Sequence, residues 1–271
     1  MRTHGKYKIH FFLSALILFS IAVSFSGCGA PQFRSPMFQY NDYTTWGPNA
    51  LTWNGRDLIM GDRNLVMEIN FIDTERYIAV DFLNEVEGYF RYSRDPYSIS
   101  SVKNLNISGL AWEGESASKG YLWVADSNNR QIVKLGNNYE VIQQFDSPAE
   151  FPRGLAYDGA NLWVADAKNA KIYKISAADG SVIGEYQSPI KTPVGIAWDC
   201  EGLWILGMDT CKTVTSSCYT PALIKLDVKS GKIALESSLP GQITRPSAIA
   251  WVDGILWISD SHTNRVFKIS A

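Results

Sequence analysis

A strand motif that recurs five times constrains the fold of this chain more than any other feature. Residues 152–166 are echoed by residues 193–205, where an apolar stretch with an aromatic end again leads through a turn into a Leu-Trp strand. Three further copies begin near Pro48, Ser108 and Pro246. Self-similarity with a period of about 40 residues is typical of a repeat architecture, in which each copy forms one structural unit.

Each copy has the pattern of four short strands separated by turns. In the copy that begins at residue 152, we expect strands at 155–157, 162–166, 171–175 and 181–186. The second strand is apolar on both faces, with Leu162 and Val164 on one side and Trp163 and Ala165 on the other. Such a strand must be covered on both sides, and a radial ring of small sheets provides that cover. The sequence therefore predicts an all-β protein, a β-propeller of four-stranded antiparallel blades.

The spacing of the copies favours five blades. The aromatic residues that end the first strand of each copy are Trp53, Trp112, Tyr157, Trp198 and Trp251. The first interval, 59 residues, is too short for two blades, but a sixth blade from residues 84–104 and the N-terminus is the alternative. The last copy ends at Ala271 after its third strand. We expect residues 32–43 to supply the missing outer strand, which would close the ring and cover a bare sheet edge.

The first 27 residues have the form of a secretory signal and stand outside the fold. Three basic residues precede an uncharged apolar run over residues 9–25. We therefore divide the chain into a signal peptide at 1–27, a linker with the closing strand at 28–46 and the propeller at 47–271. The mature chain has a net charge of −5, because the signal carries three of the 25 basic residues and none of the 27 acidic ones. This charge argues against a nucleic-acid partner.

The signal ends at Gly27 and Cys28 in a pattern that resembles the bacterial lipobox, whose cysteine is diacylated and becomes the new N-terminus. The resemblance implies lipidation of Cys28 and an outer-membrane lipoprotein that faces the periplasm or the cell surface, since Gly29 rather than an aspartate follows. Several acyl chains, at about 0.8 kcal/mol per buried CH₂, give stable attachment. Ordinary cleavage near Gly27 or Ala30 is the alternative.

Export makes the remaining cysteines candidates for disulfides. Cys211 and Cys218 lie at the two ends of a short polar loop, and we predict that they form a disulfide with each other. A strand at 203–209 would place Cys200 about 23 Å from Cys211, which is too far for a bond. We therefore expect Cys200 to be an unpaired thiol.

One end of the propeller collects the loops between second and third strands together with the blade connections, and this is the usual ligand face. The copies bring aspartates to it: Asp62, Asp126, Asp166, Asp209 and Asp260. We interpret these as turn residues that accept hydrogen bonds from backbone N–H groups, rather than as a cation or acid/base site. Residues at the start of the first strands should line the channel mouth: Asn49, Ser108, Arg153, Val194 and Ser247. Candidate ligand-face residues are Asn49, Arg130, Arg153, Arg245 and Arg265.

Residues 124–132 and 258–266 resemble the strand-turn-strand elements of the NHL-repeat and gluconolactonase-like propeller superfamily, and the resemblance extends over 48–271. It implies the architecture and leaves the function open, because that superfamily includes lactonases, lyases and binding scaffolds. Residues 58–64 and 83–87 also resemble fragments of plant-type glutaminyl cyclotransferases, which are five-bladed propellers. By that resemblance Glu85 or Glu87 would be the catalytic acid/base.

His262 is the one histidine of the mature chain, so a multi-histidine metal site is excluded. We interpret it as an exposed loop residue, with a general base as the alternative. The favoured function is a monomeric, lipid-anchored envelope module that binds a protein, peptide or glycan without a cofactor. The alternative is an enzyme: a lactonase or lyase that uses a divalent cation, or a glutaminyl cyclase. Its candidate catalytic residues are Glu85, Glu87 and His262.

Overall fold

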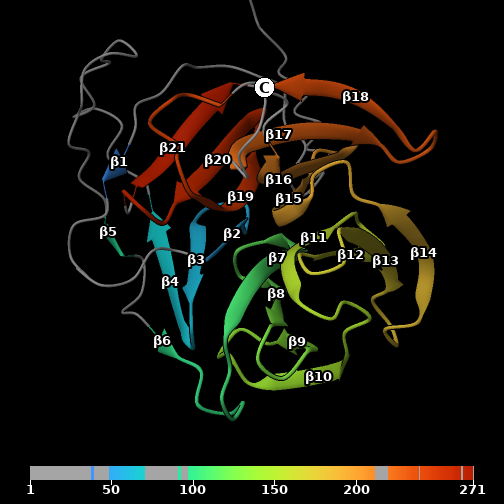
Figure 1. Cartoon of the computed structure of the whole chain (residues 1–271). Coiled ribbons are helices and arrows are strands. Elements are labelled where there is room, and N and C mark those ends of the chain that lie inside the picture. Colours follow the sequence, from blue (N-terminus) through green and yellow to red (C-terminus); the bar gives the residue numbers. More distant parts are fainter. Residues whose placement is uncertain are drawn as a thin grey trace, which may run out of the picture.

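Five antiparallel sheets stand around a central axis in the computed structural model (Figure 1). The structure describes residues 38–39, 49–70, 91–92, 97–210, 219–237, 239–263 and 265–270. No helix in this part of the chain is long and apolar enough to cross a membrane. The fold is an all-β propeller with five blades, as the repeat predicts.

The second, third and fourth blades each have four strands, which run from the axis outward in chain order. The second blade contains β7 (Ile107–Ser116), β8 (Lys119–Asp126), β9 (Gln131–Leu135) and β10 (Val141–Asp146). The third contains β11 (Pro152–Tyr157), β12 (Asn161–Asp166), β13 (Lys171–Ser176) and β14 (Val182–Gln187). The fourth contains β15 (Thr192–Trp198), β16 (Leu203–Thr210), β17 (Tyr219–Asp227) and β18 (Lys232–Ser237).

The first blade explains the long interval between the first two copies. Its strands are β2 (Ala50–Trp53), β3 (Leu58–Asp62), β4 (Leu65–Asn70), β5 (Arg91–Tyr92) and β6 (Tyr97–Ser98). Both short strands pair with β4, so together they form a divided outer edge of this blade. The described part of residues 84–104 therefore belongs to the first blade, and the alternative of a sixth blade is wrong.

The fifth blade joins the two ends of the chain. Its strands are β19 (Pro246–Val252), β20 (Ile255–Asp260), β21 (Arg265–Ser270) and β1 (Phe38–Gln39). The outer strand β1 runs antiparallel to β21, with Phe38 opposite Val266. It lies within residues 32–43, where the closing strand was expected. The domain boundaries themselves stay a prediction.

The inner strands form a closed ring in which β2, β7, β11, β15 and β19 each contact their neighbours, and β19 contacts β2 again. Glycines permit this close approach. A Cβ atom on Gly109 would lie 2.8 Å from the Gly154 backbone, and one on Gly154, where φ is +71°, would lie 2.8 Å from Gly195. The space left on the axis here is a cavity of about 10 Å³, which is about the space for one water molecule.

A tryptophan, a lysine and an acid recur together between the blades. In the third blade, Trp163 Nε1 donates to Asp158 Oδ2 at 2.9 Å, and Lys174 Nζ lies 2.8 Å from the same oxygen. The lysine also lies 4.9 Å from the centre of the indole ring. The equivalent sets are Glu113, Trp123 and Lys134 in the second blade and Asp199, Trp204 and Lys225 in the fourth. These contacts satisfy the indole N–H groups of buried tryptophans.

Cys200 is disulfide-bonded, so the prediction of an unpaired thiol is wrong. The length of a strand at 203–209 excludes Cys211 as the partner, but a cysteine distant in sequence can approach Cys200 in the folded chain. Cys28, Cys211 and Cys218 all lie outside the described residues. Lipidation of Cys28 and the pairing of Cys211 with Cys218 stay predictions.

Candidate functional site

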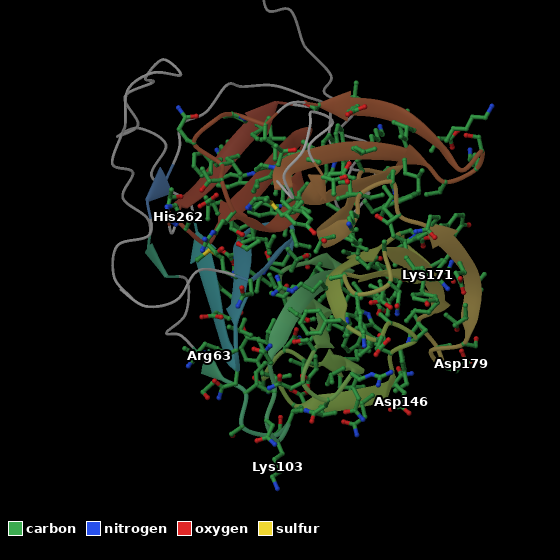
Figure 2. The ribbon with its side chains drawn as sticks, viewed as in Figure 1. Arg63, Lys103, Asp146, Lys171, Asp179 and His262 are labelled. Atoms are coloured by element: carbon green, nitrogen blue, oxygen red, sulfur yellow. The ribbon has the colours of Figure 1, made fainter. Side chains whose placement is uncertain are left out.

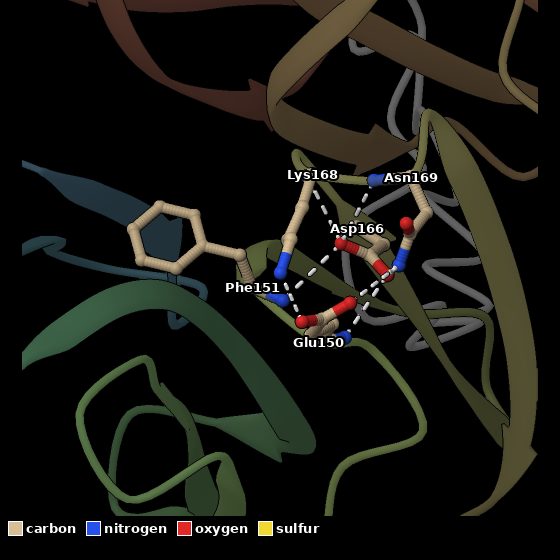
Figure 3. A network of polar contacts seen from close by, with 5 residues as sticks. All are labelled: Glu150, Phe151, Asp166, Lys168 and Asn169. Carbon is tan, nitrogen blue, oxygen red and sulfur yellow. Dashed lines mark hydrogen bonds and ion pairs between the residues drawn. The ribbon is translucent and has the colours of Figure 1, made fainter.

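Three of the repeated aspartates organise the loops of the predicted ligand face. Asp166 Oδ1 accepts hydrogen bonds from the backbone N–H groups of Lys168, Asn169 and Phe151 at 3.0–3.3 Å. Its Oδ2 accepts from the Glu150 N–H and the Asn169 side chain, both at 2.9 Å (Figure 3). Burial raises the pKa of Asp166, but these hydrogen bonds outweigh it, and the pKa lies below its ordinary value. Each aspartate thus joins the turn after its strand to the loop before its blade.

Asp126 and Asp260 have the same arrangement, which confirms the turn interpretation for three copies. Asp62 differs, because it accepts from Asn49 Nδ2 at 2.6 Å, and burial raises its pKa. Asp209 does not belong to the set. In the third blade, Asp166 lies opposite Pro152. In the fourth blade, Gly207 lies opposite the equivalent proline, Pro193. A side chain there would collide with the Thr192 carbonyl oxygen, so the aspartate is displaced.

A cavity of about 660 Å³ opens on this face between the second, third and fourth blades. Its lining residues are Arg130, Glu150, Phe151, Arg153, Ala167, Lys168, Thr192 and Val194. Arg130 ends the turn between β8 and β9, where its φ of 55° is left-handed. Arg153 lies at the start of β11, while Lys168 lies in the turn after β12. The cavity therefore combines side chains from three repeats.

The acidic residue of this cavity is already paired. Lys168 Nζ forms a charged hydrogen bond with Glu150 Oε1, and Asn169 Nδ2 donates to Glu150 Oε2 at 3.3 Å. The hydrogen bond from Lys168 lowers the pKa of Glu150. Figure 3 shows the two turn side chains meeting Glu150, while the Phe151 ring points away from them. The Glu150 carboxylate is thus engaged by the third-blade turn.

The Arg153 guanidinium has a different environment. The side chain is half-buried, and burial lowers its pKa. Its Cζ lies 5.6 Å from the centre of the exposed Phe151 ring. Within the described ranges, neither Arg153 nor Arg130 has a side-chain hydrogen bond or ion pair. The cavity therefore holds two guanidinium groups: Arg130 interacts electrostatically with Glu150, while Arg153 has no described counter-charge.

The structure brings together two of the predicted ligand-face residues, Arg130 and Arg153. Asn49 lies at the axial constriction. Arg245 is exposed on the fifth blade, where its backbone N–H donates to Asp260. Nothing described tests Glu85, Glu87 or the Arg265 side chain, since these lie outside the described part.

His262 is exposed in the turn between β20 and β21, and Figure 2 shows it on the β1 side of the molecule, away from Asp146 and Lys171. It lines none of the described cavities. Across the described ranges, no three His, Cys, Asp or Glu side chains are grouped so that they could hold a metal ion.

Ser108 and Ser247 were expected at the channel mouth, but their hydroxyl groups contact other parts of the protein. Ser108 Oγ donates to the Pro152 carbonyl at 2.7 Å, and Ser247 Oγ lies 2.9 Å from Ser259 Oγ. Sequence reasoning missed Glu150, Phe151 and Lys168 as cavity residues. A signal exists for Phe151, because the other copies have Gly47, Asn106, Thr192 and Arg245 at its place.

No protein-family model matches the chain, and no curated protein matches its sequence. Solved structures with similar folds include glutaminyl cyclase from Myxococcus xanthus, with a TM-score of 0.55 and 10% identity over 86% of this chain and 97% of that one. A chain of the mitotic checkpoint complex has a TM-score of 0.50 and 13% identity over 98% and 72%. Catalytically inactive virginiamycin B lyase from Staphylococcus aureus, with quinupristin, has a TM-score of 0.47 and 17% identity over 89% and 86%. The likeness is one of fold.

Proposed function

We propose that this protein is an envelope binding module that holds an acidic group of a protein, peptide or glycan against Arg153 and Arg130. The observation that carries the proposal is the half-buried Arg153 guanidinium, which borders a cavity of about 660 Å³ without a described counter-charge. Taking a charge out of water costs several kcal/mol unless a partner compensates. A ligand carboxylate would do so through charge-assisted, bidentate hydrogen bonds.

Comparison of the five copies supports a role in binding for Arg153. At the equivalent place the other copies have Asn49, Ser108, Val194 and Ser247, so the propeller itself does not require an arginine. A cationic site is also unusual for a mature chain whose net charge is −5. A binding site in a repeat protein is expected where the copies differ, because a ligand breaks their symmetry.

Phe151 and Val194 add an apolar wall beside the two arginines. This combination suits a carboxylate that lies next to an apolar or aromatic group, as in an acidic peptide. Export by the signal at 1–27 and attachment through Cys28 would place the module in the bacterial envelope, with the binding face directed at envelope components.

The test measures binding of a tri-glutamate peptide and a tri-glutamine peptide to the mature protein by calorimetry at two salt concentrations. We expect salt-sensitive binding of the acidic peptide alone. Arg153→Gln should weaken binding at least tenfold, which corresponds to about 1.4 kcal/mol. Arg245→Gln is the matched control, because this exposed arginine lies outside the cavity.

Equal binding of both peptides, or an unchanged affinity in the Arg153 variant, would overturn the proposal. Partners captured from envelope extracts by the wild-type protein and lost with the Arg153 variant would identify the natural ligand. Cyclisation of peptides with N-terminal glutamine would instead favour the enzyme alternative.

A further inference from the structure

A second cavity, of about 240 Å³, lies on the axis at the opposite end of the inner strands. In β11, Arg153 lies near the start of the strand and Tyr157 at its end, with Gly154 of the constriction between them. One aromatic residue from every blade lines this cavity: Trp53, Trp112, Tyr157, Trp198 and Trp251. All five are half-buried.

Aliphatic side chains line the inner end of the cavity, which is closed. One aliphatic residue from each inner strand lines it: Leu51, Leu110, Leu155, Ile196 and Ile249. Beyond them the ring of inner strands narrows to the glycine constriction. The cavity is a space for one small group and leaves no room for a chain to pass through.

Two of the aromatic rings are held in place by the neighbouring blade. Trp198 stacks on the buried Trp163, with centroids 6.1 Å apart and an angle of 10° between the rings. Trp251 stacks on Trp204 in the same way, at 6.5 Å and 17°. Because these contacts fix the rings before any ligand enters, binding would cost little side-chain ordering.

The charges at this cavity are negative. Glu115 and Asp158 line it, and none of its described lining residues is a lysine or an arginine. Asp158 is engaged by Trp163 and Lys174. Glu115 is exposed and has no described partner. Several aromatic rings with a carboxylate at the rim attract a cation through the negative faces of the rings.

We propose that the axial cavity binds an alkylammonium group, of about the size of choline, inside the ring of five aromatic residues. The cation lies against the aromatic faces, its methyl or methylene groups contact the aliphatic residues below, and Glu115 balances its charge. This site is independent of the Arg153 cavity, since the constriction separates them. It gives the module two ligands of opposite charge at its two ends.

The test titrates the mature protein with choline and with its neutral isostere 3,3-dimethyl-1-butanol, using calorimetry and tryptophan fluorescence. We expect saturable binding of choline and at least tenfold weaker binding of the alcohol. Glu115→Gln should weaken choline binding about threefold or more, because it removes the rim charge. Asp146→Asn, an exposed acid on the outer strand β10, is the matched control and should change nothing.

Trp251→Leu should abolish choline binding, and circular dichroism checks that this variant folds, because Trp251 also packs on Trp204. Equal affinity for choline and the alcohol would overturn the proposal, as would unchanged choline affinity in both the Glu115 and Trp251 variants. Arg153→Gln must leave choline binding intact. A variant that loses tri-glutamate binding but keeps choline binding shows that the two sites are separate. A variant that loses choline binding but keeps tri-glutamate binding shows the same.

Discussion

At the residue scale, Lys268 differs from Lys174 because an apolar residue stands at the place of the acid of the third blade. It faces Trp257 as Lys174 faces Trp163, with its Nζ 4.3 Å from the ring centre. The turn of this blade has the same length as that of the third blade, but the buried Val252 stands where the third blade has Asp158. Burial lowers the pKa of Lys268 to about 8.

This pKa predicts that Lys268→Met stabilises the protein at neutral pH. Since the folded-state pKa lies below the unfolded value of about 10.4, the unfolded chain binds more protons between pH 8 and pH 10.4. Stability therefore rises with pH across that window. We expect the variant to gain about 1 kcal/mol at pH 7, after allowance for solvent screening, and nothing above about pH 10.5.

Urea unfolding at pH 7, 9 and 10.5 measures the gain. The control is Lys174→Met, which loses an ion pair with Asp158 and should destabilise the protein. A Lys268 variant that is less stable than the wild type at pH 7 would contradict the prediction.

At the scale of the element, the turn after the second strand depends on its aspartate. Asp166 accepts five hydrogen bonds from two loops. Asp166→Ala leaves these donors without an acceptor and should cost about 2–4 kcal/mol of stability. Asp209→Ala is the matched control: in the described contacts Asp209 accepts only from the Thr210 N–H, so we expect less than about 1 kcal/mol.

Thermal unfolding of both variants between pH 2 and pH 7 is the measurement. The pKa of Asp166 is lowered in the folded state, so its contribution is present above the unfolded value of about 3.9 and is lost as pH falls through the folded pKa. The difference between wild type and variant should shrink in acid. Equal destabilisation by the two substitutions would be evidence against a special role for Asp166.

The strands were predictable because their pattern is local. Alternating apolar residues, turn glycines and the aromatic at the end of each first strand repeat along the chain, so the blade count and the Asp166 turn follow from spacing. Asp209 was misassigned because alignment by residue type ignored the register, which places Gly207 opposite Pro193. The Arg153 cavity was predictable only in part, since its walls come from three blades, and no single copy contains the pattern.

At the scale of the whole molecule, two features make opposite predictions for Cys28. The signal pattern predicts a lipid thioether on its sulfur. The disulfide of Cys200 needs a second cysteine. Thr210 precedes Cys211 and Tyr219 follows Cys218 in the sequence. These two described residues pair with each other at the end of β16 that is distant from Cys200. That strand spans about 26 Å, beyond the reach of a disulfide. A sulfur atom bound to lipid cannot also form a disulfide.

Labelling with palmitate decides between them. If the protein is anchored, the wild type takes up label and Cys28→Ser does not, while Cys200→Ser, which keeps the signal pattern intact, is labelled as the wild type. A digest under non-reducing conditions identifies the partner of Cys200. A peptide that joins Cys28 to Cys200, together with absence of label, would show that the protein is secreted without an anchor.

The glycine constriction also determines how solutes exchange with this protein. Because the axis is blocked where Gly109, Gly154 and Gly195 meet, the molecule is no conduit. A solute leaves by the mouth through which it entered, so its residence time depends on that mouth alone. An occupant of one compartment cannot be displaced from behind through the other.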